Sequence, residues 1–267
     1  LLEDRNGNLW VGTKGGLQIM ERETLHCFPA DSMQAQLLPS IKHVLHLFES
    51  SSGDIWVGAT NGLFRIQAAG HFYDLAALQQ AQKDGTFSIE AFKPNGTAAD
   101  AKNGNWIWNI EEGKDGQIWI GTNAGLACYD ATKNKFVSLS KAYGSGISDV
   151  LSIPIQALAA SAQDILWVGT EKGLYKLDTK RQTCTRFDGT TAVGITPRSE
   201  FITELVVDKR GHLWIGTDGS GIFRWKEKEQ TLFQYKSDLL NPNSLIDNNI
   251  ESLYLDKNEG LWIGTHK

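Results

Sequence analysis

The chain has 267 residues, which is enough for one large all-β domain or for two ordinary domains. It carries 26 Lys and Arg against 31 Asp and Glu, a net charge of -5, and these charges are spread without long runs. This balance lacks the basic stripe that neutralises phosphates, so we expect no nucleic-acid partner. The longest mostly apolar stretch, residues 150–160, falls well short of the roughly 20 residues that cross a bilayer. The chain begins inside a repeat without a basic and apolar leader, so any secretion signal is expected to be absent or to lie upstream.

One short phrase occurs six times: Trp, then Val or Ile, then Gly, then Thr or Ala. Its tryptophans stand 46, 63, 48, 47 and 48 residues apart, and a period in this range is typical of β-propellers. Because the repeat runs from end to end, it predicts a single array over residues 1–267. The six tryptophans are Trp10, Trp56, Trp119, Trp167, Trp214 and Trp262.

The fifth repeat shows how each copy makes one sheet. Residues 202–207 and 212–217 are predicted as the first two strands, with a tight turn at 208–211 between them. Residues 222–226 and 231–235 are predicted as the third and fourth strands. Four short antiparallel strands form one blade, and since a blade alone cannot bury both of its faces, blades must stack around an axis. The repeat tryptophans are therefore expected in the core between blades.

The predicted fold is an all-β propeller of four-stranded antiparallel blades, with about five and a half blades present. Residues 1–4 look like the end of a first strand, and residues 262–265 form a second strand with no third or fourth after it. The approximate blades, in chain order, are 1–40, 41–105, 106–152, 153–200, 201–248 and an incomplete 249–267.

A glycine three residues before the tryptophan marks the turn between the first two strands. We expect this turn to need a positive φ, which glycine adopts without steric penalty. The fourth repeat has Asp164 there and the sixth moves its glycine to Gly260, so these two turns are expected to differ in type. The glycines at the expected position are Gly7, Gly53, Gly116 and Gly211.

The second repeat is longer than the others, which explains the single spacing of 63 residues. We place the additional residues in the connection between the second and third blades, at 70–105. Residues 74–82 have a helical composition, with Leu75 and Leu78 three apart, and are predicted to form a short amphipathic helical turn. The insertion is either a decoration over the rim or a functional loop, because long loops are tolerated at little cost.

Aligning the five complete first strands on their tryptophans gives apolar residues twelve and nine positions before each of these tryptophans. These two columns differ in parity, so a β-bulge or a strong twist is required between them. The column ten positions before is polar or small, and we predict that it faces the central channel. Its members are His46, Asn109, Ala157, Glu204 and Ser252.

Trp106 and Trp108 begin the first strand of the third blade, directly after the insertion. They alternate with Ile107 and therefore share one face of the strand. Two aromatic side chains beside amides near a channel mouth would suit stacking on a sugar or an aromatic ring. Packing of both indoles between blades is the alternative. With Arg198 and Asn249 placed on the loops just above the channel column, the predicted ligand-binding residues are Trp106, Trp108, Asn109, His46, Arg198, Glu204 and Asn249.

The phrase Asp-x-x-Gly-x-Leu-Trp-Ile-Gly-Thr at residues 208–217 resembles the two-component regulator propeller repeat. Residues 4–13 match it equally well, and the six copies cover essentially the whole chain. The resemblance implies seven-bladed propellers, often two in series, outside the bacterial inner membrane. It also implies a β-sandwich, a membrane span and a cytoplasmic histidine kinase or diguanylate cyclase farther along the parent chain. This segment is accordingly expected to be a periplasmic, non-catalytic sensor domain that binds a small molecule or an oligosaccharide, with no cofactor and no metal.

Two architectures stay open for the parent protein. A segment of a seven-bladed propeller needs further blades, because an open array exposes unpaired strand edges. Closure as five blades would instead pair residues 250–255 with residues 9–12 and leave the last strand redundant. Further blades and signalling modules of the parent chain are the expected partners, with a homodimer as an additional candidate.

A propeller enzyme, either a lyase or a glycoside hydrolase, is the rival hypothesis for function. It would need two or three ionisable groups that converge across the channel, drawn from His46, Glu204, Arg198 and Glu251. Glu111 is adjacent to Glu112 rather than opposed to it, so these two make a poor acid and base pair. No Gly-x-Ser-x-Gly elbow, Walker loop or Gly-x-Gly-x-x-Gly fingerprint occurs. A protein-docking platform is a third hypothesis, since fold does not determine function.

Overall fold

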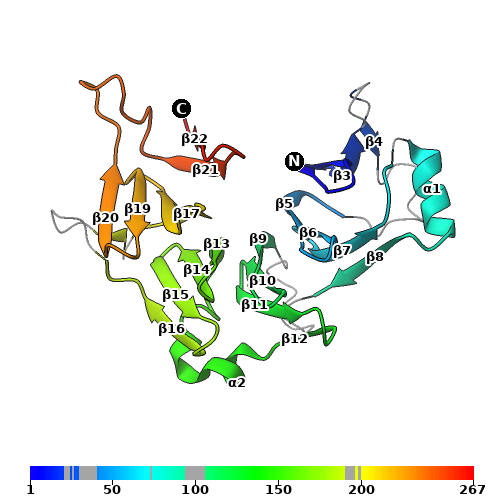
Figure 1. The fold of residues 1–267 in the computed structure, drawn as a ribbon, viewed down its shortest axis with the longest axis horizontal. Coiled ribbons are helices and arrows are strands. Elements are labelled where there is room, and N and C mark those ends of the chain that lie inside the picture. The colour runs from blue at the N-terminus through cyan, green and yellow to red at the C-terminus, as the bar shows by residue number, and fades with distance from the viewer. Residues whose placement is uncertain are drawn as a thin grey trace.

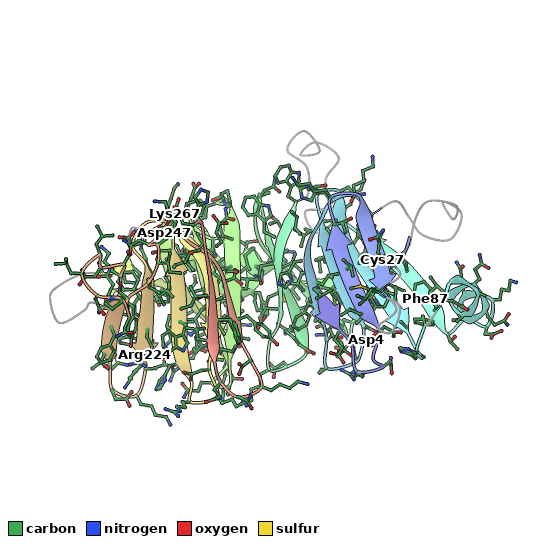
Figure 2. All side chains as sticks on the ribbon, turned by 90° about the horizontal axis from the view of Figure 1, so that it is seen from above. Asp4, Cys27, Phe87, Arg224, Asp247 and Lys267 are labelled. Carbon is green, nitrogen blue, oxygen red and sulfur yellow. The ribbon has the colours of Figure 1, made fainter. Side chains whose placement is uncertain are left out.

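The computed structural model describes residues 1–20, 25, 27–29, 41–72, 74–93, 106–189, 196–197 and 200–267. Within these residues the chain forms six antiparallel sheets, five of four strands and one of two. Figure 1 shows the sheets radiating in chain order around a hollow centre, with the first strand of each sheet innermost. Figure 2, turned by 90°, shows the strands running across the thickness of this disc. The predicted partial propeller of about five and a half blades is confirmed.

The six sheets are blades 1 to 6 in chain order. Blade 1 contains β1 (Leu2–Glu3), β2 (Leu9–Thr13), β3 (Gly16–Met20) and β4 (Cys27–Pro29). Blade 2 contains β5 (Val44–Glu49), β6 (Ile55–Ala59), β7 (Gly62–Ala68), helix α1 (Leu75–Lys83) and β8 (Phe87–Phe92). Blade 3 contains β9 (Ile107–Glu112), β10 (Gln117–Thr122), β11 (Gly125–Asp130) and β12 (Lys135–Phe136), followed by α2 (Leu139–Tyr143) and the 3₁₀ helix η2 (Gly144–Ile147).

Blade 4 contains β13 (Ile155–Ser161), β14 (Ile165–Thr170), β15 (Gly173–Asp178) and β16 (Thr183–Arg186). Blade 5 contains β17 (Ile202–Val207), β18 (His212–Thr217), β19 (Ile222–Lys226) and β20 (Thr231–Tyr235). Blade 6 contains only β21 (Ile250–Leu255) and β22 (Leu261–Thr265).

The last sheet does not close the ring on the first. β21 pairs with β22, and β2 pairs with β1 and β3. The alternative closure as five blades, with residues 250–255 against residues 9–12, is therefore wrong. Neighbouring inner strands pack on one another in the order β1, β5, β9, β13, β17 and β21. Figure 1 shows an opening between blade 6 and blade 1.

In three blades, an aspartate side chain in the turn between the first two strands forms a hydrogen bond with the repeat tryptophan. In blade 1 the Asp4 carboxylate accepts hydrogen bonds from two backbone N–H groups of the turn and, at 2.8 Å, from the Trp10 indole N–H. One side chain thus holds both the turn and the ring. The same bond joins Asp208 to Trp214 and Asp256 to Trp262.

The predicted positive φ in this turn is confirmed, with values between +71° at Gly116 and +91° at Gly53. The expectation that blade 6 differs is wrong. Glu259 takes a φ of +65°, and its N–H donates to the carbonyl of Asp256 as the glycine of other blades does. Asp164 in blade 4 also takes a positive φ, of +59°. The backbone geometry is therefore kept where the glycine is lost, although a residue with a Cβ is strained there.

The repeat tryptophans occupy the core only where the next blade covers them. Trp10, Trp56 and Trp119 are 1% exposed and Trp167 is 2% exposed. Trp214 is half-buried, and Trp262 is 65% exposed. The prediction of a core position is wrong for Trp262, because no described blade packs on its face of blade 6.

The glycine two residues after the tryptophan allows the next blade to approach closely. A Cβ atom on Gly58 would lie 2.8 Å from the carbonyl oxygen of Ile107, and one on Gly121 would lie 2.9 Å from Ile155 Cγ2. Both partners are the apolar residues twelve positions before the next tryptophan. The tryptophan of the repeat phrase therefore places a large ring in the core, and its glycine leaves space for the first strand of the next blade. The same contact joins Gly12 to Val44, Gly169 to Ile202 and Gly216 to Ile250.

The insertion of blade 2 lies partly elsewhere than predicted. The predicted helix is present as α1, and its N-cap Asp74 accepts a hydrogen bond from the Ala77 N–H at 2.7 Å. However, β8 follows α1 and pairs with β7, so the helix connects the third and fourth strands, at the rim in Figure 1, and not blades 2 and 3. The sequence prediction missed the strand at residues 87–92. Leu78 of the helix packs into a buried cluster with Phe72 and Phe87, which supports a structural role for this part of the insertion.

Candidate functional site

A β-bulge occurs at the same point in five inner strands. The pairing of β5 with β6 skips from Val44 to His46, and the shift recurs at the equivalent position of β9, β13, β17 and β21. The bulge predicted between the two apolar columns is confirmed. It sets the channel column opposite the glycine of the repeat phrase in each blade. The residues of this column are His46, Asn109, Ala157, Glu204 and Ser252.

Glu111 marks the edge of the channel. Each inner strand has a strand partner on one side only, so its other edge borders the hollow centre. The Ala160 N–H of β13 is not used for pairing with β14 and donates to Glu111 Oε1 at 3.1 Å. The Glu111 carboxylate therefore lies against the free edge of β13, between blades 3 and 4.

Two glutamates on different blades share one electrostatic environment. Burial raises the pKa of Glu111 to about 7, against the lowering effect of the Ala160 hydrogen bond, and the charge of Glu112 adds to the increase. Burial also raises the pKa of Glu204 to about 7, and the charge of Glu111 raises it further. Each carboxyl group is therefore half protonated near neutral pH.

Glu111 is the candidate that sequence reasoning set aside, because it is adjacent to Glu112. In the structure the two side chains point apart, and Glu112 accepts a hydrogen bond from the Ser51 N–H of blade 2 at 2.6 Å. The available signal was the strand period, since Glu111 is two residues after Asn109 and shares its face.

Three polar side chains of the inner strands have a buried atom without a hydrogen-bond partner among the described residues. They are His46 Nδ1, Asn109 Oδ1 and Thr203 Oγ1. Asn109 as a whole is only 6% exposed. Burial, and then the charge of the amino terminus, lowers the pKa of His46 to about 4, so its ring is neutral at pH 7. Buried polar atoms normally have partners, and these three are therefore candidates for contact with a ligand or with water.

Trp106 and Trp108 lie against each other in an edge-to-face arrangement, with ring centroids 6.4 Å apart and an angle of 69° between the planes. Trp108 is the residue that the bulge of β9 leaves unpaired. Trp106 is 45% exposed, so the alternative in which both indoles pack between blades does not hold for it. An aromatic pair, with Trp106 exposed and Trp108 half-buried, thus directly precedes Asn109 in the chain.

No contact between the remaining predicted residues and this group is seen in the described part of the chain. Arg198 lies outside the described residues. Asn249 precedes β21, and its N–H donates to Asp247 Oδ1 at 3.0 Å. Glu251 is exposed and lies 3.1 Å from His266 Nδ1. No hydrogen bond or ion pair joins His46, Glu204 and Glu251, the ionisable groups of the enzyme hypothesis that the structure describes.

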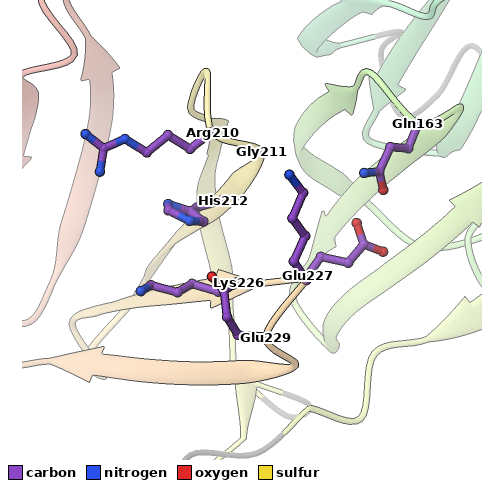
Figure 3. Close-up of a pocket in the computed structure, with 8 residues that line it drawn as sticks. Gln163, Arg210, Gly211, His212, Lys226, Glu227 and Glu229 are labelled. Atoms are coloured by element: carbon purple, nitrogen blue, oxygen red, sulfur yellow. The ribbon is translucent and has the colours of Figure 1, made fainter.

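Two further observations limit the choice of site. In the described part of the chain, no three His, Cys, Asp or Glu side chains converge to hold a metal ion. A surface hollow of about 350 Å³ lies outside the channel and is lined by charged side chains such as Arg210 and Glu227, as Figure 3 shows. His212 in this hollow is 3.0 Å from Asp208, the aspartate that fastens the turn of blade 5. We therefore assign the residues of this hollow to the structure of blade 5 and not to the candidate site.

The fold and its repeat define a partial β-propeller. Residues 1–15, 102–124, 196–219 and 244–267 match the family model described as two component regulator propeller. The resemblance that the repeats imply is thus confirmed for four of the six repeats.

Comparison with known proteins gives relatives much longer than this chain. Histidine kinase P4 of Formosa agariphila is 28% identical over 165 residues, which are 60% of this chain and only 12% of the kinase. The extracellular domain of a putative hybrid two-component system from B. thetaiotaomicron has a TM-score of 0.63 at 17% identity, covering 99% of this chain and 38% of that one. Virginiamycin B lyase from Staphylococcus aureus has a TM-score of 0.61 at 14% identity, covering 98% of this chain and 75% of the lyase. At such identities the structural likeness shows the fold alone.

None of the helices in the described ranges has the length and apolar character that a bilayer span requires.

Proposed function

We propose that this propeller segment is a non-catalytic ligand-recognition domain of a bacterial signalling receptor and lies in the periplasm. The family match, the similarity to a histidine kinase and the fold shared with an extracellular sensor domain support this assignment. The observation that carries it is the pair of the exposed Trp106 and the half-buried Trp108, next to the buried Asn109, whose Oδ1 has no partner among the described residues. A cofactor has no part in this proposal.

The ligand is a small molecule or an oligosaccharide that stacks on the two indoles and reaches into the channel. Aromatic faces supply contact area with little loss of conformational freedom, and polar groups below them fix orientation. The binding residues of this proposal are Trp106, Trp108, Asn109, His46, Arg198, Glu204 and Asn249.

The signal passes to the parent chain through further blades and an output module, a histidine kinase or a diguanylate cyclase. The exposed Tyr254 and Trp262, at 64% and 65%, lie on the face of blade 6 that equivalent residues of other blades bury. A further blade on this face, as in a seven-bladed ring, covers them. A ligand that binds one arrangement of these partners more tightly shifts the equilibrium towards it.

Thermal-shift screening of the purified chain against oligosaccharides and small metabolites tests this proposal. A ligand that binds only the folded state raises Tm, and at a given concentration a tighter ligand raises it more. We expect the shift to be lost in Trp108→Ala and retained in Trp262→Ala, which removes an exposed indole from another face. Equal shifts in wild type and Trp108→Ala would show that the binding site lies elsewhere.

A propeller enzyme, a lyase or a glycoside hydrolase, is the second candidate. It is favoured by one observation, the two half-buried carboxyl groups of Glu111 and Glu204 with a pKa near 7, a value suited to general acid and base catalysis. Any ligand found in the screen is therefore incubated with the protein and analysed by mass spectrometry. Recovery of the unchanged ligand supports the sensor, and turnover that Glu204→Gln abolishes supports the enzyme. A protein-docking platform is the third candidate, and capture of a defined protein by the Trp262 face would favour it.

A further inference from the structure

Strand β22 has a free edge although its sequence is that of a strand paired on both sides. Residues 261–265 read Leu-Trp-Ile-Gly-Thr, and residues 213–217 in β18 of blade 5 have the same sequence. β18 pairs with β17 and with β19, whereas β22 pairs only with β21 among the described residues. An unpaired edge presents backbone N–H and C=O groups to which a further strand can add. The strand that pairs with β18 is therefore a template for one that can pair with β22.

The side of blade 5 that lies next to this edge is aromatic and basic. Leu213, Phe223 and Leu232 pack in the cluster shared with blade 4, so the residues that alternate with them face blade 6. The strands β18, β19 and β20 contain no Asp or Glu. Figure 1 shows β19 and β20 towards the rim, beyond the inner pair of β21 and β22. The aromatic and basic residues of this side, the basic face, are His212, Trp214, Arg224, Lys226, Phe233 and Tyr235.

Arg224 is a half-buried cation without an acidic partner. Its guanidinium carbon lies 5.1 Å from the centre of the Trp214 ring, 5.2 Å from that of Phe233 and 5.6 Å from that of Tyr235. Its Nε atom is buried without a hydrogen-bond partner, and Arg224 forms no ion pair within the described part of the chain. Aromatic faces stabilise a cation in part, but a charge removed from water normally has an opposite charge beside it. Arg224 therefore marks a position for a carboxylate.

Two other blades show how a cation at this position is neutralised. The third-strand residue opposite the repeat tryptophan is Arg65 in blade 2, Lys176 in blade 4 and Arg224 in blade 5. In blade 2 the acid comes from the same sheet, since Arg65 pairs at 2.6 Å with Glu90, its neighbour on the fourth strand. The neighbour of Arg224 on the fourth strand is Phe233, so blade 5 does not supply the acid in this way.

In blade 4 the acid comes from the next blade. Lys176 pairs with Glu227, which directly follows the third strand of blade 5. Blade 6 has no third strand among the described residues, and a hollow of about 520 Å³ is lined by Tyr235 of blade 5 and Leu261 of β22. A third strand on β22 would enter this hollow and bring the residue that follows it to Arg224.

We propose that β22 pairs with a β-hairpin whose first strand runs antiparallel to residues 261–265 and is followed by an Asp or Glu that pairs with Arg224. The hairpin is assigned to the further blades of the parent receptor, so the inference rests on the proposed function. It specifies two properties of this partner, strand addition to β22 and a carboxylate for one cation. Charge complementarity favours an acidic hairpin, because the strands of the basic face offer Arg224 and Lys226 no negative charge.

A copy of the hairpin of blade 5 tests the proposal on the full chain. Residues 220–236 are appended after Lys267, which leaves four residues between β22 and the copied Ile222, as there are between β18 and Ile222 in blade 5. The copy carries Glu227 directly after its first strand. Because the hairpin is tethered, its effective concentration at β22 is on the order of millimolar.

We expect the appended hairpin to raise Tm by about 4 °C or more and to protect the backbone amides of β22 from hydrogen exchange. Arg224→Gln in the chain, or Glu227→Gln in the copy, is expected to remove at least about half of the rise. Both changes together are expected to remove no more than either alone, because they delete the same ion pair. Lys180→Gln, which removes a positive charge from an exposed turn of blade 4, is expected to leave the rise within about 1 °C.

Each variant is also melted without the appended hairpin, so that its effect on the fold itself is subtracted. A charge exchange adds a test in which binding is regained. Arg224→Glu in the chain is expected to abolish the rise in Tm, because it places like charges together. Glu227→Lys in the copy is then expected to restore at least about half of it.

Three results overturn the inference. One is an appended hairpin that neither raises Tm nor protects β22 from exchange. Another is a rise that Arg224→Gln leaves unchanged, since the strand then docks without the proposed carboxylate. The third is a dimer of the chain without the appended hairpin, measured by light scattering and dissociated by Arg224→Gln, because a second copy then occupies the basic face.

Failure here is distinguishable from failure of the proposed function. The ligand screen uses the chain without the appended hairpin and depends on Trp108. If Trp108→Ala abolishes a ligand shift while the hairpin fails to dock, the sensor proposal stands and the hairpin inference falls. If the hairpin docks and no ligand shifts Tm, the edge of β22 stands as a docking site and the sensor proposal falls.

Discussion

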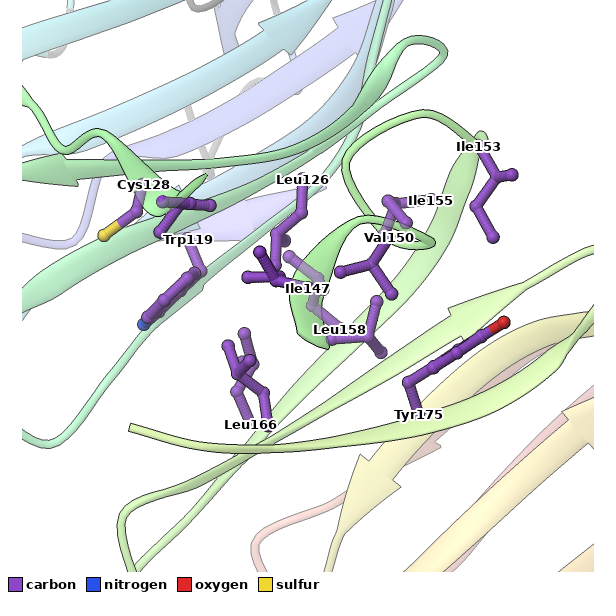
Figure 4. Close-up of a cluster of buried hydrophobic side chains, with 13 residues drawn as sticks. Trp119, Leu126, Cys128, Ile147, Val150, Ile153, Ile155, Leu158, Leu166 and Tyr175 are labelled. Atoms are coloured by element: carbon purple, nitrogen blue, oxygen red, sulfur yellow. The ribbon is translucent and has the colours of Figure 1, made fainter. Parts of the chain in front are cut away.

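The junction between blades 3 and 4 and the junction between blades 5 and 6 use the same sequence phrase but bury it differently. At the first, Trp119 is packed among side chains of all parts of blade 4, including Leu158, Leu166 and Tyr175, as Figure 4 shows. At the second, the buried cluster is reduced to Ile222, Ile250 and Leu253, and Trp214 is only half-buried. Blade 6 lacks the third and fourth strands that supply the outer half of the contact.

The inner halves of the two junctions are nevertheless alike. A Cβ atom on Gly121 or on Gly216 would lie 2.9 Å from the Cγ2 atom of the isoleucine in the next inner strand. Where the outer strands are missing, a hollow of about 520 Å³ lined by Trp214, Tyr235 and Leu261 takes their place. The comparison teaches that the first two strands of a blade are enough for its first strand to pack closely against the preceding blade. Burial of the preceding blade's tryptophan requires all four strands of the next blade.

Removal of the tryptophan is the strongest test of this difference. Trp119→Ala is expected to lower the free energy of unfolding by about 3–5 kcal/mol, because it opens a large cavity in a closed core. Trp262→Ala is expected to change it by no more than about 0.5 kcal/mol, because the ring is largely in solvent. Urea denaturation followed by circular dichroism measures both. Similar losses in the two variants would show that the face of blade 6 is covered in solution.

The inner strands of blades 3 and 5 can be compared through one half-buried glutamate on each, Glu111 and Glu204. The folded pKa of Glu111 and of Glu204 is about 7, above the ordinary 4.5. Between these values the unfolded chain releases protons that the folded chain retains, so the free energy of unfolding falls as the pH rises from 4.5 to 7 and is constant above that.

Each carboxyl group accounts for at most about 3 kcal/mol of this loss. Glu111→Gln and Glu204→Gln are both expected to flatten the pH profile and to raise stability at pH 8. Denaturation curves between pH 4.5 and pH 8.5 measure the effect. If only Glu111→Gln flattens the profile, the Glu204 carboxyl group is open to solvent and the inner strands of blades 3 and 5 differ.

The close approach of inner strands gives a third test. Gly121→Ala places a Cβ atom against the side chain and the carbonyl of Ile155, and overpacking of this kind costs about 1–3 kcal/mol. At Gly264 the nearest atom is the Ser252 hydroxyl of the same blade, at 2.4 Å, and this group can rotate away. Gly264→Ala is therefore expected to cost less than about 1 kcal/mol. Thermal denaturation of the two variants shows whether the glycine is required by the neighbouring blade or by the strand itself.

The repeat made most of this fold predictable from the sequence. A fixed period with a large ring and a nearby glycine specifies the strands, their pairing and the bulge, because each recurs in several independent copies. Residues 87–92 escaped prediction because the helix before them displaced β8 from its expected spacing. The exposure of Trp262 could not follow from its own repeat, since burial depends on the blade that comes next.

The candidate site was less predictable than the fold. The column of His46, Asn109 and Glu204 could be aligned because it keeps a constant distance from the tryptophan. Glu111 was passed over because its chemistry depends on a contact with Ala160, 49 residues away, and on burial that no local pattern reports. The partners of Arg198 depend on the course of its loop, which the repeat does not specify.

The smallest expected effect concerns the turn between the first and second strands of a blade. Asp164 holds a φ of +59°, a conformation that costs a residue with a Cβ about 1 kcal/mol relative to glycine. Asp164→Gly is therefore expected to raise the free energy of unfolding by about 0.5–1 kcal/mol, even though it removes an exposed ion pair with Lys114 at 3.5 Å, which contributes little. Gly116→Ala, the reverse change in blade 3, is expected to lower stability by a similar amount. If Asp164→Gly destabilises the chain, the ion pair between blades 3 and 4 outweighs the strain of the turn, and this junction gains stability from its polar rim as well as from its core.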